Sequence, residues 1–288
     1  MLEGVVAKAD GYYYYELGNV VKTGWIKVDN DYYCFSTGGK ALTGYQYVGT
    51  YLNSTSRDPF GYGNFTFAED GKLQNGLVHL DDGVYYYENG ITVKTGWILI
   101  DGEYYFFTTG GKAVTGKTYI GTYATNKSRD PYKVGTFEFS EEGKLLDGII
   151  EKEDGHYYYV KGIASKLRLV KHEDEYYYVD TDGKLSTGRF YVGTSATNNL
   201  LAPGYRTFAE DGHMYDGIEE IDGELYYYEL GNVSDSAMGL ILIGEDLYYV
   251  GANGKLVVGE RFYVGSSKVN GYVPNGYYTF DEDGKLIK

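Results

Sequence analysis

Short aromatic runs bounded by turn-forming residues recur along the whole chain. A typical unit reads Asp-Gly-x-Tyr-Tyr-Tyr, as at Tyr13–Tyr15 and Tyr85–Tyr87. Tyrosine and phenylalanine favour a pleated, half-buried surface, and the flanking glycines allow the positive φ of tight turns. No stretch shows a convincing 3.6-residue apolar period. The pattern therefore predicts β-hairpins and an all-β fold.

The hairpin pattern repeats with a long period. Trp25 and Trp97 lie 72 residues apart, each in a Lys-Thr-Gly-Trp-Ile string, and the Ser-Arg-Asp-Pro strings ending at Pro59 and Pro131 have the same spacing. A fixed period of this kind is the signature of a repeat protein. Residues 1–288 are therefore interpreted as a single repeat array, with four copies at about 4–75, 76–147, 148–216 and 217–288.

Each copy divides into three smaller units of roughly 20, 20 and 32 residues. The second unit places aromatics before a Gly-Lys turn such as Gly39-Lys40, and the third places an aromatic-Thr-Phe string before Glu-Asp-Gly-Lys, as at Phe65–Phe67 and Gly71-Lys72. One hairpin cannot bury its own aromatic face, whereas stacked hairpins bury a continuous stripe. We therefore expect a solenoid of stacked β-hairpins, with three hairpins in each of the four repeats of about 72 residues.

Composition narrows the class of protein further. The chain of 288 residues contains 36 Tyr, 42 Gly and one Cys, so it has too much apolar surface for a disordered segment and too few thiols for a disulfide scaffold. Its net charge of −15 argues against nucleic acid and anionic membranes as partners. No apolar run is long enough to insert into a bilayer, and no signal peptide opens the chain.

Residues 95–116 resemble a known family motif. They read Thr-Gly-Trp-Ile-Leu-Ile-Asp-Gly-Glu-Tyr-Tyr-Phe, followed by a Gly-Lys turn at Gly111-Lys112 and Thr115-Gly116, and residues 23–44 repeat the pattern. This pattern is similar to the cell-wall-binding repeat superfamily of Gram-positive surface proteins. Its members include choline-binding modules, glucan-binding repeats of glucosyltransferases and the C-terminal repeats of large clostridial toxins. The resemblance covers essentially the whole chain.

The resemblance implies shallow aromatic sites between neighbouring hairpins. In choline-binding members, such a site uses the Gly-Trp tryptophan, an aromatic that opens the following string and an aromatic of the next hairpin. The Gly-Trp position is Trp25 and Trp97 in the first two copies but Leu169 and Leu240 in the last two. Sites of the family type are therefore expected only in the first half of the chain.

Two sets of candidate ligand-binding residues follow. The first is aromatic and could stack on a sugar ring or enclose a quaternary ammonium, although the same rings could simply form the hairpin core. Its members are Trp25, Tyr32, Tyr33, Trp97, Tyr104 and Tyr105.

The second set lies in the long loops of the third units, at 50–64, 122–136, 194–205 and 266–277. Long loops on a rigid scaffold often carry function. Arg57-Asp58 and Arg129-Asp130 could hydrogen-bond sugar hydroxyls, or could equally brace their own loops beside the proline that follows.

Catalysis and metal binding find little support in the sequence. The four histidines occupy different places in the repeat and lack metal-ligand spacing, and the acidic turns supply too few oxygen ligands for calcium. Cys34 stands where the second copy has Phe106, which indicates a packing residue. No enzyme activity, cofactor or metal site is predicted.

The sequence therefore predicts a non-catalytic module that binds a polysaccharide, glycan or cell-wall polymer, with avidity from its repeated sites. The alternative is a structural spacer or adhesin that presents the long loops to a host protein. The resemblance implies an extracellular or cell-surface setting, without nucleic-acid binding or membrane insertion, and the chain is expected to be a fragment of a larger secreted protein.

Overall fold

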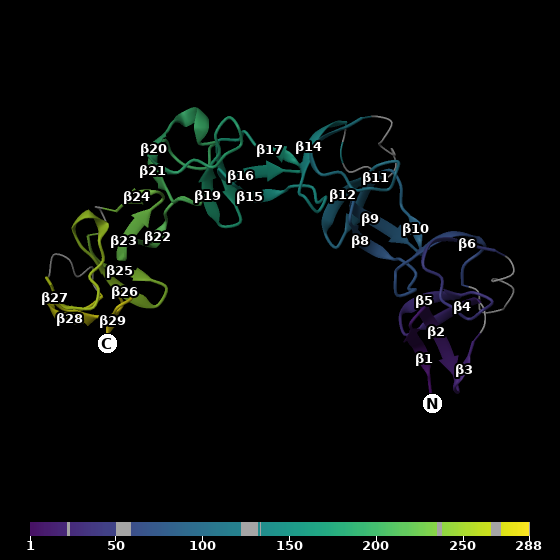
Figure 1. Cartoon of the computed structure of the whole chain (residues 1–288). Helices are drawn as coiled ribbons and strands as arrows, with labels where there is room; N and C mark the ends of the chain where they lie inside the picture. The colour runs from purple at the N-terminus through teal and green to yellow at the C-terminus, as the bar shows by residue number, and fades with distance from the viewer. Residues whose placement is uncertain are drawn as a thin grey trace. The chain divides into compact units, whose positions relative to one another are not determined.

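The computed structural model describes residues 1–21, 24–49, 59–121, 132, 134–234, 238–265 and 272–287. Within these ranges every extended element is a short antiparallel strand, and the helical content is confined to two 3-10 turns, η1 (Thr194–Ala196) and η2 (Ala252–Gly254) (Figure 1). The all-β prediction is confirmed. The chain divides into two compact units, Met1–Leu146 and Asp147–Lys288.

The first unit is a succession of small sheets, each made of two or three strands that are adjacent in sequence. Its strands are β1 (Gly4–Lys8), β2 (Gly11–Glu16), β3 (Asn19–Val20), β4 (Gly24–Val28), β5 (Asp31–Phe35), β6 (Gly44–Val48), β7 (Gly63–Phe67), β8 (Gly76–Leu80), β9 (Gly83–Glu88), β10 (Ile91–Thr92), β11 (Gly96–Ile100), β12 (Glu103–Phe107), β13 (Gly116–Ile120) and β14 (Gly135–Phe139).

The second unit has the same organisation. Its strands are β15 (Gly148–Lys152), β16 (Gly155–Val160), β17 (Ile163–Ala164), β18 (Leu169–His172), β19 (Glu175–Tyr178), β20 (Gly188–Val192), β21 (Gly204–Phe208), β22 (Gly217–Ile221), β23 (Glu224–Glu229), β24 (Asn232–Val233), β25 (Gly239–Ile243), β26 (Asp246–Val250), β27 (Arg261–Val264), β28 (Gly276–Phe280) and β29 (Leu286–Ile287).

Tight turns of the predicted kind close the short hairpins. Between β11 and β12, Asp101 and Gly102 both have positive φ, at 51° and 89°. Two consecutive positive φ values define a type I′ turn, whose twist matches that of the flanking strands. Asp222 and Gly223 form the same turn between β22 and β23.

Within each unit, backbone hydrogen bonds join successive hairpins. After each Gly-Lys turn the chain returns to the preceding hairpin, so that the Leu73 amide donates to the Tyr32 carbonyl at 2.7 Å and the Leu145 amide to the Tyr104 carbonyl at 2.7 Å. In the second unit the Leu256 amide donates to the Leu225 carbonyl at 2.8 Å. These bonds bring the aromatic faces of neighbouring hairpins into contact. That the four copies continue as one solenoid stays a prediction.

The core of each unit is a series of separate apolar clusters between neighbouring hairpins. In the first unit one cluster contains Trp25, Cys34 and Phe65, and the corresponding cluster of the next repeat contains Trp97, Phe106 and Phe137. In the second unit Leu169 and Leu240 occupy the positions of the two tryptophans and are fully buried. In the described residues, no helix has the length and hydrophobicity needed to cross a membrane.

Candidate functional site

Trp25 lies at the centre of an aromatic cluster formed by two hairpins and the end of a long loop. It projects from β4, opposite Cys34 of β5, and its indole meets the edges or faces of Phe60, Phe65 and Phe67 at centroid distances of 4.9, 5.2 and 5.7 Å. These contacts leave Trp25 only 2% exposed.

The second repeat builds the same cluster from residues that are 72 positions further on. Trp97 pairs across the hairpin with Phe106 and packs against Tyr132, Phe137 and Phe139 at 4.8, 5.2 and 5.7 Å. It is 5% exposed. Each tryptophan is therefore held by rings from the third hairpin of its own repeat, which explains why its face is covered in this structure.

Tyr32 and Tyr104 form the accessible margin of these clusters. Each is half-buried, and each ring meets the loop aromatic edge-on, Tyr32 with Phe60 at 5.0 Å and Tyr104 with Tyr132 at 5.2 Å. The structure thus brings Trp25 together with Tyr32 and Trp97 with Tyr104, as the candidate sites require, but it presents the tyrosines rather than the tryptophans to solvent.

Tyr33 and Tyr105 point to the opposite face of the same strands. Both are buried, where Tyr33 packs with Phe35 and Tyr105 with Phe107 at centroid distances of 6.0 and 6.1 Å. Burial raises the pKa of both phenols above the usual range, because the ionised form would lose its hydration. These two tyrosines lie apart from the tryptophan clusters, in the core beneath the preceding hairpin.

The second candidate set lies outside the described residues. Arg57, Asp58, Arg129 and Asp130 belong to segments 50–58 and 122–131, so their binding role stays a prediction.

Carboxylates of the short turns are engaged by tyrosines. The hydroxyls of Tyr13, Tyr85 and Tyr157 each donate to the aspartate three residues earlier, at 2.7 to 2.8 Å. This bond lowers the pKa of Asp10 and Asp154 from the ordinary value, because it stabilises the ionised carboxylate. Nowhere in the described part of the chain do three or more His, Cys, Asp or Glu side chains gather as metal ligands.

A first groove lies between the first two hairpins of the first unit. Its walls include Tyr14 of β2, Trp25 and Lys27 of β4, and Tyr32 of β5, around a volume of about 530 Å³. The Lys27 ammonium lies 5.4 Å from the centre of the Tyr32 ring. This is the position between neighbouring hairpins at which the sequence predicts an aromatic site.

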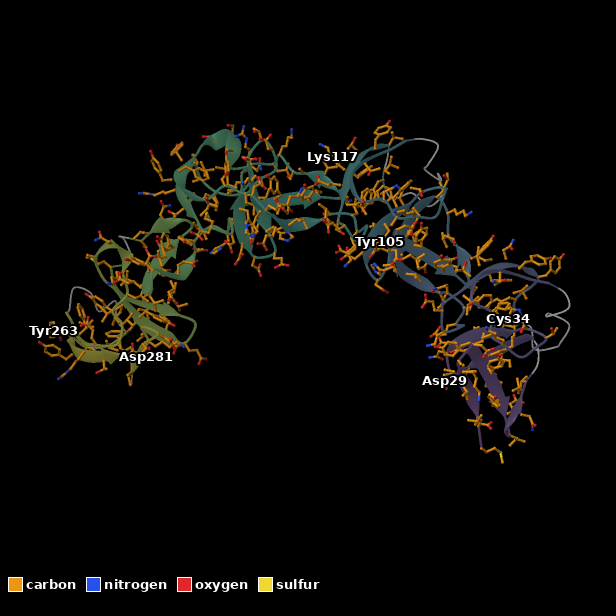
Figure 2. All side chains as sticks on the ribbon, in the orientation of Figure 1. Asp29, Cys34, Tyr105, Lys117, Tyr263 and Asp281 are labelled. Atoms are coloured by element: carbon orange, nitrogen blue, oxygen red, sulfur yellow. The ribbon has the colours of Figure 1, made fainter. Side chains whose placement is uncertain are left out.

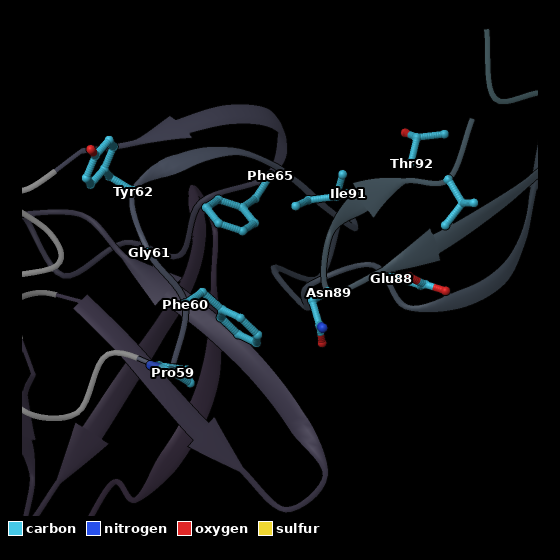
Figure 3. A pocket seen from close by; sticks show the side chains of 10 residues that line it. Pro59, Phe60, Gly61, Tyr62, Phe65, Glu88, Asn89, Ile91 and Thr92 are labelled. Carbon is cyan, nitrogen blue, oxygen red and sulfur yellow. The ribbon is translucent and has the colours of Figure 1, made fainter. Parts of the chain in front are cut away.

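A second, larger groove of about 700 Å³ lies where the long loop before β7 meets the hairpin of β9 and β10 (Figure 3). Phe60, Tyr62 and Phe65 line it from one side, and Ile91 of β10 lies across from Phe65. Polar groups of Glu88, Asn89 and Thr92 lie along its margin; all of the groove belongs to the first unit.

Backbone contacts fix the two walls of this larger groove. The Thr66 amide donates to the Gly90 carbonyl, and the Gly90 amide donates to the Gln74 carbonyl, both at 2.8 Å. The turn that carries Asn89 is therefore bonded directly to the hairpin that carries Phe65. A groove with bonded walls needs little ordering when a ligand enters, which lowers the cost of binding.

Sequence reasoning named the candidate loop 50–64, which contains Phe60 and Tyr62, but singled out neither residue, and it missed Ile91. The signal available for Phe60 was its counterpart Tyr132, 72 positions later and also directly after the Ser-Arg-Asp-Pro string. For Ile91, an isolated apolar residue after an Asn-Gly turn gives no indication of the hairpin that it will face.

Comparison with known proteins gives one match in sequence and several in structure. No family model matches the chain. It is similar to glucosyltransferase-S of Streptococcus mutans serotype c, with 23% identity over 246 residues, and the match spans 77% of this chain but only 15% of that protein.

The solved structures that resemble the chain include choline binding protein F from Streptococcus pneumoniae, with 20% identity, a TM-score of 0.30 and full coverage of both chains. The modular autolysin LytC from Streptococcus pneumoniae matches with 14% identity and a TM-score of 0.34, over 88% of this chain and 52% of that one.

The sequence match to part of a streptococcal glucosyltransferase agrees with the family resemblance that the Gly-Trp and Tyr-Tyr-Phe motifs carry.

Proposed function

We propose that this chain is a non-catalytic module that binds a polysaccharide or cell-wall polymer at the surface of a Gram-positive cell. The observation that carries the proposal is the alignment of 77% of the chain with a protein named as a glucosyltransferase, an enzyme class that handles glucose units. The aligned region is only 15% of that protein, so we propose a binding role for this chain and no part in the transfer reaction.

The chemistry of the larger groove suits a sugar polymer. A pyranose ring has an apolar face of C–H groups and a rim of hydroxyls, and aromatic surfaces flanked by hydrogen-bonding groups match both. Phe60, Tyr62 and Ile91 supply the apolar surface, while Glu88 and Asn89 lie at the rim. Because this groove is the larger of the two and combines both kinds of surface, we assign the main binding site to it.

The groove beside Trp25 is a second candidate for the same function. Its margin combines the rings of Tyr14 and Tyr32 with the Lys27 ammonium and the Glu16 carboxylate. Mixed charges beside aromatic rings suit a polar sugar unit, and an ammonium at the margin disfavours a quaternary ammonium ligand, because like charges repel. The aromatic sites of the sequence prediction thus remain proposals, with Tyr32 and Tyr104 as their accessible members.

Affinity electrophoresis in gels that contain a neutral α-glucan, and pull-down with a choline-bearing wall polymer, test this function. Ile91→Ser and Tyr62→Ala should each weaken retardation by the glucan about tenfold, as expected when an apolar contact worth about 1.5 kcal/mol is lost. Leu99→Ser is the matched control, because Leu99 and Ile91 are both 55% exposed but Leu99 lies on β11, outside the groove.

Three outcomes are informative. Weakening by Ile91→Ser but not by Leu99→Ser supports the groove. If Ile91→Ser and Leu99→Ser bind the glucan equally well, the binding site lies outside this groove. The Tyr32→Ala and Tyr104→Ala variants then test the aromatic clusters. Absence of binding to every polysaccharide and wall polymer would overturn the proposed function.

A further inference from the structure

The outer face of the third hairpin in every repeat carries an exposed tyrosine. These residues are Tyr47, Tyr119, Tyr191 and Tyr263, each 72 positions after the one before, and all are among the exposed large side chains. Each stands one position before the buried aliphatic residue that ends its strand: Val48, Ile120, Val192 or Val264. The core does not require them, because the opposite face of the same hairpin does the packing.

In the second unit this face carries a second tyrosine and an arginine in addition to the repeated tyrosine. On β20 and β21, Tyr191 and Tyr205 are directly paired across the hairpin, with ring centroids 5.4 Å apart, and the Arg189 guanidinium lies 5.4 Å from the centre of the Tyr205 ring. We call Arg189, Tyr191 and Tyr205 the first arginine–tyrosine face.

The same arrangement recurs 72 residues later. On β27 and β28, Tyr263 and Tyr277 are paired with centroids 5.1 Å apart, and the Arg261 guanidinium lies 4.9 Å from the Tyr277 ring. Arg261, Tyr263 and Tyr277 form the second arginine–tyrosine face, and Figure 2 shows Tyr263 projecting from the outside of its hairpin.

The corresponding hairpins of the first unit differ in charge. Tyr45 replaces the arginine on β6, and on β13 the equivalent Lys117 lies directly opposite Glu138 in the strand register. By contrast, Arg189 is opposite Thr207, and Arg261 is opposite Thr279. Among the described residues of these four hairpins, only those of the second unit place a cation beside two exposed tyrosines with a neutral residue across the strand.

Neither arginine has an ion-pair partner among the described residues, although the chain as a whole carries a net charge of −15. The Arg–Tyr contact orients each guanidinium over a ring and leaves its N–H edge accessible for a bidentate bond to an anion. A cation held in this way, in a chain with so many carboxylates, is complementary to a negatively charged ligand.

We propose that the two arginine–tyrosine faces bind an anionic polysaccharide, with a pyranose ring against Tyr191 or Tyr263 and its carboxylate or phosphate group on the neighbouring arginine. The tyrosine and arginine are two residues apart on one strand, or about 6.6 Å, which is close to the span of a sugar ring with its charged substituent. This inference rests on the proposed function, since it names the polymer class that the second unit selects. Nucleic acid has the same combination of charge and rings. The net charge of −15 opposes every polyanion equally, so it is the proposed function that favours a polysaccharide over nucleic acid.

Binding to four probes tests the proposal: polygalacturonate, phosphorylated dextran, neutral dextran and single-stranded oligo-dT. The chain should bind one or both anionic polymers more tightly than neutral dextran. The double variant Arg189→Gln/Arg261→Gln should lower that affinity about tenfold, as expected for loss of a charge-assisted hydrogen bond, and leave neutral dextran binding unchanged. Lys117→Gln, at the equivalent position of the first unit, is the matched control and should change nothing.

The remaining outcomes separate the two proposals. A preference for anionic polymers that survives the double arginine variant overturns the assignment of these faces, as does equal affinity for charged and neutral dextran; in both cases carbohydrate binding itself stands. Tighter binding of oligo-dT that depends on the arginines assigns the faces to nucleic acid and overturns the polysaccharide proposal. Absence of binding to every polysaccharide overturns this inference together with the proposed function.

The two anionic probes also identify the anion, because polygalacturonate carries carboxylates and phosphorylated dextran carries phosphates. The anion is the one on the polymer whose binding the double arginine variant weakens.

Discussion

The indole of Trp25 and the ring of Phe60 meet edge to face, with centroids 4.9 Å apart and an interplanar angle of 68°. Phe60 follows a long loop, so a residue 35 positions away covers the tryptophan that the hairpin motif presents. Tyr132 covers Trp97 in the same way, at 4.8 Å and 70°. Both tryptophans therefore stabilise the contact between the second and third hairpins of their repeats.

Truncation of either tryptophan should destabilise the first unit. We expect Trp25→Ala and Trp97→Ala each to lower the free energy of unfolding by about 3–5 kcal/mol, because a large buried ring is replaced by a cavity. Equilibrium denaturation followed by circular dichroism measures this loss. It follows that loss of ligand binding in these variants reports unfolding, and that binding is better tested with exposed residues such as Ile91.

Trp25→Phe provides the control. The indole Nε1 groups of Trp25 and Trp97 are buried and have no hydrogen-bond partner among the described residues. Phenylalanine keeps an aromatic ring in the cluster and removes the unsatisfied N–H, whose burial costs about 1–3 kcal/mol. We therefore expect Trp25→Phe to be much milder than Trp25→Ala. Equal destabilisation by the two changes would contradict this account of the cluster.

Gly90 joins two repeats at a point where no side chain fits. Its φ is +75°, and an added Cβ would lie 2.4 Å from Cδ1 of Leu73 and 3.3 Å from the Cβ of Phe65. We expect Gly90→Ala to cost about 2–4 kcal/mol, the sum of the left-handed backbone penalty and overpacking. Thermal unfolding of the purified variant measures the loss.

Gly44→Ala separates these two contributions. Gly44 has a similar φ of +69°, but nothing lies within 4 Å of an added Cβ. Its replacement should cost only the backbone penalty of roughly 1–2 kcal/mol. If the two variants unfold at the same temperature, the close contact between Gly90 and Leu73 does not contribute.

The buried position of Cys34 gives a probe of opening in the first unit. Cys34 is fully buried opposite Trp25, in the place that Phe106 takes in the second repeat, so its interpretation as a packing residue is confirmed. We expect a thiol reagent to react slowly with the native chain and rapidly in guanidinium chloride. Fast labelling under native conditions, at the rate of a free thiol peptide, would show that the Trp25 cluster opens readily.

Hairpins were predictable here because turn chemistry and aromatic content agree at every copy. The Asp101-Gly102 turn is an example, since its sequence specifies two positive φ values and the structure has them. The burial of Trp25 was not predictable in the same way, because the covering ring of Phe60 comes from a loop whose path no local pattern encodes. Tyrosines pose a related difficulty: the ring is apolar and the hydroxyl polar, so a Tyr-Tyr string alone does not say whether Tyr32 or Tyr33 faces solvent.

In the candidate site, contacts within one hairpin were predictable from the sequence, whereas contacts between repeats were not. Sequence named Trp25 and Tyr32 correctly as neighbours, because both belong to one hairpin. It missed the groove at Phe60 and Ile91, whose walls come from different repeats. The regular 72-residue spacing of Tyr191 and Tyr263 was visible in the sequence, but only the strand register shows that Arg189 and Arg261 share a face with them.

His213 introduces a pH dependence into the second unit. It follows Gly212 at the place where the other repeats have a Gly-Lys turn, and it bridges to Tyr177 as Lys72 does to Tyr33. Its Nδ1 lies 2.6 Å from a carboxylate oxygen of Asp211, and its Nε2 lies 3.7 Å from Glu219.

Burial disfavours the charged imidazolium, but the hydrogen bond and charge of Asp211, with Glu219 and Glu175 nearby, outweigh it and raise the pKa of His213 above its ordinary value. A raised pKa means that the folded state binds the proton more tightly than the unfolded state. The resulting stability is fully present below the unfolded pKa of 6.5 and is lost as the pH rises through the higher folded value.

We therefore expect the second unit to become less stable as the pH rises from below 6.5 through the higher folded pKa of His213. His213→Lys should remove this part of the pH dependence, because lysine stays charged throughout and can meet the same carboxylates. His213→Gln should lower stability below the unfolded pKa of 6.5 and lower it progressively less as the pH rises through the folded pKa of His213. Denaturant midpoints of the three proteins, measured as a function of pH, test this effect. A pH slope that persists unchanged in His213→Lys would show that His213 is not its source.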